Sequence, residues 1–396
     1  MRLEPSPELA EFRARLRAFI TERSPAAREH TGVRAPEPEL LPRLRTWIAD
    51  LYEQGYLGID WPAEYGGRPG AHPLEAFIVT EELALAGAWE QIGAAGLAAG
   101  AIIDFGTEEQ KRYFLPRIRA AEDIWCQLFS EPGAGSDLAA LSTRARREGG
   151  EFVVDGQKVW TTNGHLANLG YLLARTDPDA PRHRGITAFA LDMRTPGVDI
   201  RPLREITGTS DFNEVFLDGV RIPASRVIGE VNDGWRVAMS SLGHERTGVS
   251  GRGAELFRAL DDLADVAAGA TAPSGQPALT DSAIRRQIGD MACRVRVNDL
   301  MSKLAQSGVA AGRDDPAAAP LGKIFFSETN LALAELGMAI PGPDGLLTEG
   351  DPGAVARGWW QDAFLYARAY TIAGGANEVL RNVVAERVLG LPRDRR

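Results

Sequence analysis

The spacing of apolar residues changes twice along the chain, and this change limits the possible folds more than any other feature. From about 7 to 123 the apolar residues recur at helical spacing, as in "ELAEFRARLRAFI". From about 124 to 230 the pattern becomes that of short strands separated by turn residues, and from about 231 to 396 it is helical again. The order helical, β, helical predicts a multidomain α+β protein.

Each zone is long enough to form a domain with its own core. The predicted domains are an N-terminal α-helical domain over 1–123, a compact antiparallel β domain over 124–230, and a C-terminal four-helix bundle over 231–396. Long helical segments joined by short loops are typical of such a bundle. "GTEEQKRYFLPRI" predicts a helix capped by Thr107. The pair Asp155-Gly156 predicts a tight turn between two strands.

Composition excludes several classes of partner. The formal net charge of -10 argues against nucleic acid, which binds clustered Lys and Arg. Cys126 and Cys293 are the only cysteines, so we expect neither a disulfide framework nor a cysteine metal site. The charged N-terminus is unlike a signal peptide, and the apolar run "QIGAAGLAAGAII" is too short for a membrane span. A cytoplasmic protein with no membrane insertion is expected.

Two stretches of the β zone carry candidate binding residues. "WCQLFSEPGAGSDLAAL" has glycines that bend the backbone, so that its N–H groups can converge on an anion or a ring oxygen. A plain surface loop is an equally good interpretation of this stretch alone. "QKVWTTNG" places Trp160 and Thr162 on one face of a strand. An aromatic plane beside a hydroxyl suits a flat, redox-active ring, although a core Trp beside a surface Thr is the simpler alternative.

The order of these pieces resembles that of the FAD-dependent acyl-CoA dehydrogenases. The helical zone, "FSEPGAGSD", "VWTTNG" and the closing "GGANEVLRNVVAERVLGLP" follow one another as in that family, over nearly the whole chain. The resemblance implies the family fold, with FAD between the β and C-terminal domains. It also implies oxidation of an acyl-CoA to the trans-2-enoyl-CoA, with electrons passing to an electron-transfer flavoprotein.

The resemblance assigns a set of residues to the cofactor. In that family the segment matching Gln127 to Ser136 lines the flavin, and the Thr matching Thr162 lies near N5, the hydride acceptor. Ser136 also meets the pantetheine arm of the thioester. The residues assigned to the FAD site are Gln127, Phe129, Ser130, Gly135, Ser136, Trp160, Thr161, Thr162, Arg285, Ala376 and Glu378.

The catalytic base is assigned by the same resemblance. Many family members carry the glutamate that removes the α-proton at the position of Gly374, which has no side chain here. In a subset that acts on branched or bulky acyl groups, the carboxylate comes from an early helix of the bundle, in an "ER" pair. "SLGHERTGVSG" contains that pair, so Glu245 is predicted to be the base. His244, Arg246 and Gly374 are assigned to the substrate. A Glu–Arg pair on a solvated helix face is the alternative.

The sequence departs from the family pattern where the charged half of FAD is held. The familiar homotetramers bring an arginine from a neighbouring subunit to the pyrophosphate, but the matching position here is Thr271. A threonine that usually touches the cofactor is replaced by Ala376. Arg285 is a candidate substitute, because a diphosphate prefers a fork of donors. Otherwise the chain is one member of a heteromer, or a partner subunit that binds flavin poorly.

The leading hypothesis is therefore an FAD-dependent acyl-CoA dehydrogenase that forms a homo- or hetero-oligomer, either a dimer or a tetramer. An oxidase and a dehydrogenase of carrier-protein thioesters remain open alternatives. The Gly/Ala-rich segment 81–107 would form a wall of the acyl pocket with room for a bulky group. Close packing between helices explains that composition equally well.

Overall fold

The chain forms two compact units in the computed structural model, which describes residues 6–28, 30, 32–251, 253–272, 275–313 and 315–393, without the side chains of 243–251. The sheet unit comprises Val33–Ala71 and Trp89–Glu245. The bundle unit comprises Met1–Gly32, His72–Ala88 and Arg246–Arg396. Both units are discontinuous in sequence. This division does not test the predicted domain ranges 1–123, 124–230 and 231–396, which stay a prediction.

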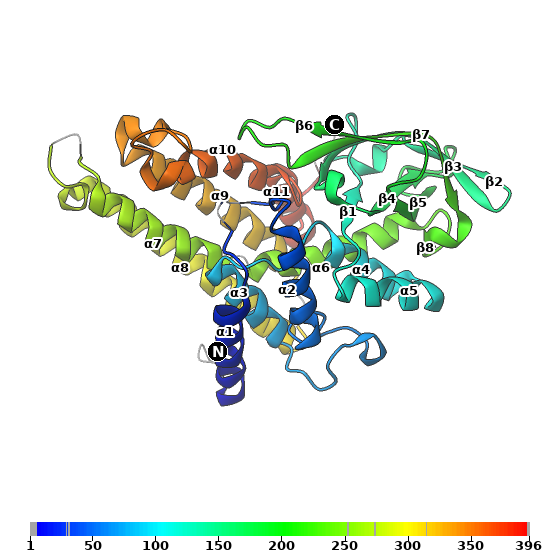
Figure 1. The fold of residues 1–396 in the computed structure, drawn as a ribbon, viewed down its shortest axis with the longest axis horizontal. Coiled ribbons are helices and arrows are strands. Elements are labelled where there is room, and N and C mark those ends of the chain that lie inside the picture. Colours follow the sequence, from blue (N-terminus) through cyan, green and yellow to red (C-terminus); the bar gives the residue numbers. More distant parts are fainter. Residues whose placement is uncertain are drawn as a thin grey trace. The chain divides into compact units, whose positions relative to one another are not determined.

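A twisted sheet forms the centre of the sheet unit (Figure 1). Its strands are β1 (Trp125–Leu128), β2 (Arg144–Glu148), β3 (Glu151–Thr162), β4 (Leu169–Arg175), β5 (Ile186–Asp192), β6 (Val198–Leu203), β7 (Phe212–Pro223) and β8 (Val227–Ile228). Their order is β6-β7-β3-β2-β4-β5-β8, with β1 paired to β4. Most pairs are antiparallel, as expected for this zone. The β1–β4 pair and a single β2–β4 pairing are parallel, so the sheet is mixed.

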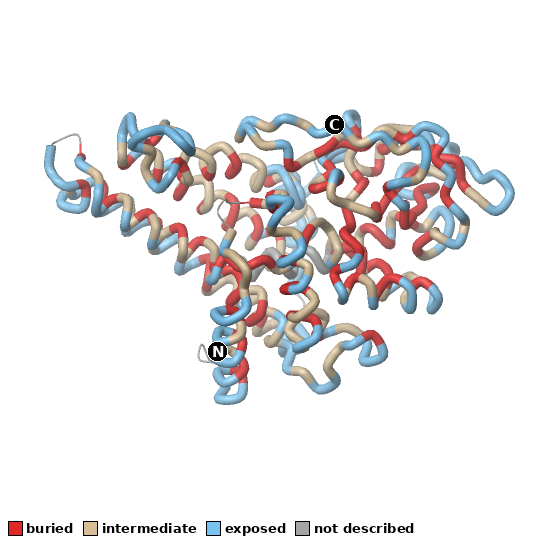
Figure 2. The backbone as a smooth tube through the Cα atoms, viewed as in Figure 1, coloured by how far each residue is buried: buried red, intermediate tan, exposed pale blue. Residues whose placement is uncertain are grey.

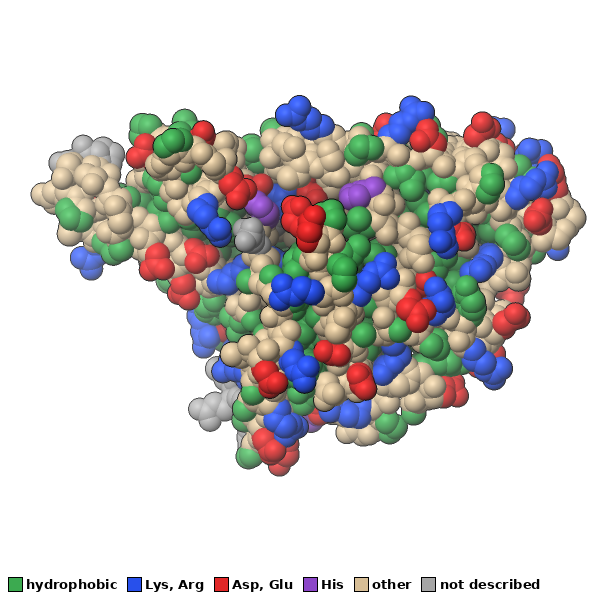
Figure 3. All heavy atoms as spheres, in the orientation of Figure 1, with side chains coloured by type: hydrophobic (Ala, Val, Ile, Leu, Met, Phe, Trp, Pro, Cys, Tyr) green, Lys and Arg blue, Asp and Glu red, His purple; other side chains and the backbone are tan. Residues whose placement is uncertain are grey.

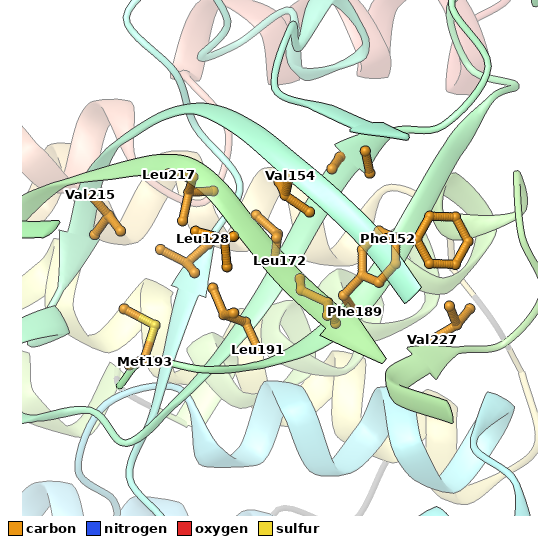
Figure 4. Packing of buried hydrophobic residues seen from close by; sticks show 14 of the residues in the cluster. Leu128, Phe152, Val154, Leu172, Phe189, Leu191, Met193, Val215, Leu217 and Val227 are labelled. Atoms are coloured by element: carbon orange, nitrogen blue, oxygen red, sulfur yellow. The ribbon is translucent and has the colours of Figure 1, made fainter. Parts of the chain in front are cut away.

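The apolar core of this unit lies on one face of the sheet, where side chains from several strands point toward one another (Figure 4). Leu128 from β1, Phe152 from β3, Leu172 from β4 and Phe189 from β5 are each almost fully buried. The rings of Phe152 and Phe189 meet edge to face at 5.2 Å. β4 and β5 are buried along almost their whole length and are red in Figure 2, whereas β2 and β6 are mostly exposed or half-buried.

The turn predicted at Asp155-Gly156 is wrong. β3 continues through both residues, and the hairpin turn lies at Gly149-Gly150 between β2 and β3. Gly156 sits at a register shift between β3 and β7. A Cβ on Gly156 would lie 2.4 Å from Thr143 Oγ1, so the glycine admits a close neighbour within a strand rather than closing a turn.

Helices complete the sheet unit. They are α2 (Leu41–Glu53), α4 (Ala95–Phe105), α5 (Glu108–Arg119) and the first part of α6 (Gly234–Gly251). Thr107 caps α5 as predicted: its side chain accepts from the Gln110 N–H, and Gln110 accepts from the Thr107 N–H in return. In α4 the alanines Ala98 and Ala101 are fully buried, so small residues here serve close packing. Whether this helix also lines an acyl pocket stays a prediction.

The bundle unit is made of long helices packed side by side. They are α1 (Pro7–Arg23), α3 (Glu75–Ala86), α7 (Gly253–Gly269), α8 (Ser282–Ala310), α9 (Ala318–Ala339), α10 (Trp359–Ile372) and α11 (Asn377–Val383), followed by a π-helical turn over Val384–Val388. Leu263 of α7, Val295 of α8, Leu333 of α9 and Trp360 of α10 are buried in one core cluster. The apolar run before the paired glycines, which resembles a strand in the sequence, is the end of α10.

Acidic and basic side chains alternate over the surface shown in Figure 3, and no basic stripe runs across that face. Within the described residues no helix is both long and apolar enough to cross a bilayer.

Candidate active site

A glycine-rich turn follows β1 and presents its backbone to solvent. Glu131 and Ala134 exchange two backbone hydrogen bonds of 3.0 Å, which close the turn. Gly133 and Gly135 are exposed, and a Cβ on either would meet nothing within 4 Å among the described residues. Ser136 is exposed and Ser130 is half-buried. The turn therefore offers hydroxyls and backbone to a ligand instead of packing them in the core.

A buried ion pair fixes this turn to β3. Lys158 is fully buried and donates from Nζ to Glu131 Oε1 at 2.7 Å and to the Phe129 carbonyl at 3.0 Å. Glu131 also accepts from the backbone N–H groups of Ser142, at 2.6 Å, and Thr143, at 2.9 Å. The Val159 N–H donates to the Ser130 carbonyl at 2.9 Å. The turn and the strand are thus held as one rigid piece.

The charges of this pair are set by burial and by each other. Burial by itself would raise the pKa of Glu131, but the charge of Lys158 and the surrounding donors lower it to about 2. Burial lowers the pKa of Lys158 to about 8, against the opposite pull of Glu131. Both groups are therefore charged at neutral pH. Sequence reasoning missed this pair, because its two members are separated by 27 residues in the chain.

Trp160 has the most unusual environment in the strand. Its φ is 60°, in the left-handed region, and the β3–β7 register shifts between Lys158 and Thr161. A non-glycine residue there is strained by roughly 1–2 kcal/mol. Its side chain is nevertheless 61% exposed and meets Phe212 only edge to face, at 6.1 Å. An aromatic plane held out of the core by a strained backbone is a candidate ligand platform.

The neighbours of Trp160 complete this edge of the site. Thr161 is fully buried and Thr162 is half-buried, so exposure alternates over 160–162 and Thr162 shares the outward side with Trp160. Asn163, also left-handed at φ 52°, donates from its backbone to the Asp211 carbonyl at 2.8 Å. Gln127 is half-buried in β1, and Phe129 is buried with its ring 4.9 Å from that of Tyr171.

Helix α6 is attached to the same sheet. Tyr171 in β4 and Ser241 in α6 are both fully buried, and their hydroxyl oxygens lie 3.2 Å apart. The Ser241 hydroxyl donates back to the Val237 carbonyl at 3.1 Å, so the Tyr171 hydroxyl is the donor to Ser241. The predicted base Glu245 and its neighbours His244 and Arg246 lie further along this helix, and their side chains are outside the described residues.

The paired glycines lie in the bundle unit, between α10 and α11. Gly374 and Gly375 have φ of 66° and 103°, a conformation that favours glycine. A Cβ on Gly374 would meet nothing within 4 Å among the described residues. The Gly375 carbonyl accepts from Lys323 Nζ of α9 at 2.6 Å. Burial lowers the pKa of Lys323 to about 8. Sequence reasoning also missed Lys323.

The other predicted cofactor residues of this unit occupy its surface. Ala376 precedes α11 and is half-buried, and Glu378 is exposed in the first turn of α11. Arg285 is exposed in the first turn of α8, and Thr271 is exposed and bridged to Pro277 just before it. Ser274, in the same loop, is outside the described residues. The candidate residues on the glycine-rich turn and on β3 belong to one connected part of the sheet unit. The cofactor-binding roles of Arg285, Ala376 and Glu378 stay predictions.

Comparisons with known proteins agree with the architecture. Family models match at residues 6–122 (acyl-CoA dehydrogenase, N-terminal domain), 126–220 (middle domain) and 232–389 (C-terminal domain). The acyl-CoA dehydrogenase IpdE1 of Mycobacterium tuberculosis is 38% identical over 98% of this chain and 99% of its own length. FadE34 of the same organism is 42% identical over 90% of this chain, but the match spans only 47% of FadE34.

Solved structures give the same result. "Tcur3481-Tcur3483 steroid ACAD" superposes with a TM-score of 0.86, at 31% identity and full coverage of both chains. The "ChsE4-ChsE5 complex from Mycobacterium tuberculosis" gives a TM-score of 0.85 at 30% identity, again covering both chains fully. The predicted fold class and the predicted family are confirmed: the chain belongs to the acyl-CoA dehydrogenase family of oxidoreductases.

Proposed function

We propose that this chain oxidises an acyl thioester to its trans-2-enoyl product with FAD as cofactor. The observation that supports this best is the junction of the glycine-rich turn with β3 through the buried Lys158–Glu131 pair, which joins the exposed backbone of Gly135 to the strand that carries the exposed Trp160. In the reaction the α-carbon loses a proton, the β-carbon loses a hydride, and a double bond forms between them. FAD, when bound, would supply the acceptor for this hydride, and we propose an electron-transfer flavoprotein as the final electron acceptor.

The residues on this edge fit a flavin ring. The exposed indole of Trp160 supplies a flat surface for stacking, and Thr162 supplies a hydroxyl beside it. Ser130 and the accessible backbone at Gly135 supply hydrogen-bonding groups for ring oxygens and nitrogens. We assign Gln127, Phe129, Ser136 and Thr161 to the support of the same ring, as the family resemblance implies. The Lys158–Glu131 pair holds these groups in place before any ligand arrives.

Glu245 is our proposed base for the α-proton. Helix α6 runs without interruption from Gly234 to Gly251, and Ser241 anchors it to the sheet. Position 245 is four residues beyond Ser241, about one turn further along the same helix. Gly374 cannot supply a base, because it has no side chain. His244 and Arg246 are proposed to contact the substrate.

A bulky acyl group is the substrate that we propose. Gly374 and Gly375 leave the turn between α10 and α11 without side-chain volume, and the space at the Gly374 Cβ position is open among the described residues. The similar structure of Tcur3481-Tcur3483 is described as a steroid ACAD. We therefore propose a thioester whose acyl group carries a fused-ring system of comparable size.

A heteromeric assembly is the second candidate, and it differs in how FAD is held. Thr271, which takes the place of the usual pyrophosphate-binding arginine, is exposed and has no cationic group to offer. This chain would then contribute only Arg285, Ala376 and Glu378 to the binding of the cofactor's charged half. Two similar solved structures are named for pairs of different proteins. A different partner subunit would then complete the pyrophosphate site.

The test is a visible spectrum of the purified chain, followed by anaerobic titration with acyl-CoA thioesters of increasing bulk. A flavin spectrum that a ring-containing thioester bleaches is expected. Bleaching should be lost in Glu245→Gln but retained in Glu230→Gln, the matched change at an exposed residue just before α6. Bleaching that persists in Glu245→Gln would refute the base assignment. A colourless chain that gains flavin only with a second subunit would favour the heteromer.

A further inference from the structure

One buried lysine binds the backbone of the turn that contains Gly374 and Gly375. Lys323 of α9 is 7% exposed, and its Nζ lies 2.6 Å from the Gly375 carbonyl oxygen and 2.8 Å from Asn377 Oδ1. The first acceptor belongs to the turn and the second to the first residue of α11. A single ammonium group therefore joins the turn, the start of the next helix and α9.

A second residue of α9, Ser327, also contacts the first residue of α11 and lies one helical turn beyond Lys323. Asn377 Nδ2 donates to Ser327 Oγ at 3.0 Å, and the Ser327 hydroxyl donates to the Ile324 carbonyl at 3.0 Å. Lys323 and Ser327 are four residues apart and share one face of α9. Arg381 of α11 forms an ion pair with Glu328 of α9 close by. These contacts attach α11 and its preceding turn to α9.

The turn needs such an attachment because its backbone has little intrinsic preference for this shape. Consecutive glycines at φ 66° and 103° have access to many other conformations, and both are exposed. Few packing contacts restrict Gly374, since its Cβ position is open among the described residues. Without the bond to the Gly375 carbonyl, the turn would populate conformations in which its backbone fills that open space.

We propose that Lys323 is a positioning residue that holds the Gly374-Gly375 turn open for the acyl group of the thioester. This inference rests on the proposed function and adds a residue that acts through the turn, without touching substrate. The protonated lysine makes the stronger bonds, since charge-assisted hydrogen bonds exceed neutral ones. Glu378 and Glu328 favour the charged form of Lys323, and burial opposes it more strongly, so its pKa falls to about 8.

The test compares Lys323→Met with Lys303→Met in the flavin-loaded protein. Lys303 is a matched control in the same bundle: it pairs with Asp299 on its own helix, and in the described part of the chain it makes no hydrogen bond to the turn. Losing a charge-assisted bond in Lys323→Met should raise KM for a bulky acyl-CoA at least about ten-fold, while kcat stays within about two-fold. Lys303→Met should leave both unchanged. Equal KM values in the two variants would overturn the proposal.

Hydrogen–deuterium exchange of residues 373–380 separates this proposal from the proposed function. Amide exchange there should quicken at least about ten-fold in Lys323→Met and not in Lys303→Met, whether or not an acyl-CoA is the substrate. Unchanged exchange would refute the positioning role even if the enzyme is a dehydrogenase. Faster exchange with an unchanged KM would refute the link to substrate.

If Lys323→Met does not fold, the unsubstituted protein decides. Burial lowers the pKa of Lys323 to about 8, below its usual 10.5, so any opening of the turn that frees this lysine takes up protons in that range. The exchange of 373–380, corrected for intrinsic rates, should therefore slow as the pH rises from 7 to 9. A flat exchange profile would overturn the proposal.

Discussion

Separating Glu131 from Lys158 should destabilise the sheet unit far more than breaking a surface ion pair. The two charged atoms are 2.7 Å apart, and the side chains are 3% and 0% exposed. Lys158→Met removes the ammonium but keeps most of the chain length. It leaves a buried carboxylate with only the donors of Ser142 and Thr143. Removing one partner of a buried pair costs about 3–5 kcal/mol, and we expect a loss in this range.

The pH dependence gives an independent magnitude. The pKa of Glu131 falls from 4.5 to about 2 on folding, so its contribution is complete above pH 4.5 and is lost as pH falls toward 2. At 1.36 kcal/mol for each pKa unit, that contribution is about 3 kcal/mol. Lys158 has the opposite slope: its folded pKa of about 8 lies below the usual 10.5, so its linkage raises stability as pH rises between these values.

Urea unfolding at pH 7 of Lys158→Met, Glu131→Leu and the double variant tests the reasoning. The double variant should lose less than the sum of the single losses, with a coupling of about 2–3 kcal/mol. Arg182→Met is the control. Arg182 forms an ion pair with Asp137, next to the glycine-rich turn, with an N···O distance of 2.8 Å, but these two side chains are 69% and 57% exposed. That pair should contribute less than about 1 kcal/mol. If Lys158→Met loses no more unfolding free energy than Arg182→Met, the argument from burial is wrong.

Three further outcomes follow from the site. In Glu245→Gln, the added change Gly374→Glu should restore part of the anaerobic bleaching, because the family resemblance puts the usual base at this position and its Cβ position is open among the described residues. The φ of 66° should cost roughly 1–2 kcal/mol in thermal unfolding. Trp160→Gly should change the unfolding free energy by less than about 1 kcal/mol, since relief of strain offsets the lost ring contact, yet it should weaken flavin binding in a fluorescence titration. Tyr171→Phe should lose about 1 kcal/mol in urea unfolding, because only the hydrogen bond to Ser241 disappears.

Much of the fold could be predicted because the period of the apolar residues reports which face of an element is buried. The capped helix at Thr107 was also predictable, because its cap and its first turn lie within four residues of sequence. Asp155-Gly156 misled because a glycine in a strand and a glycine in a turn look alike in sequence. The distinguishing contact, with Thr143 just before the adjacent strand β2, depends on the sheet register.

The supports of the site could not be predicted, because their partners are distant in sequence. Glu131 and Lys158 are separated by 27 residues, and Lys323 and Asn377 by 54. A lone lysine in an apolar stretch is usually solvated, so nothing local identifies it as buried. The family resemblance names the residues that would touch a cofactor. Only packing shows which residues keep those groups in place.

The two buried lysines solve the same physical problem at two glycine-rich turns. Glycines give each turn an accessible backbone, but they also allow the turn many backbone conformations, so a ligand bound there would not be held in one position. In each case an ammonium group from a neighbouring strand or helix binds a main-chain carbonyl at the turn, that of Phe129 or of Gly375. Burial lowers the pKa of both lysines to about 8. Both values lie below the usual 10.5, so the linkage of each lysine should raise the stability of its turn as the pH rises from about 8 to 10.5.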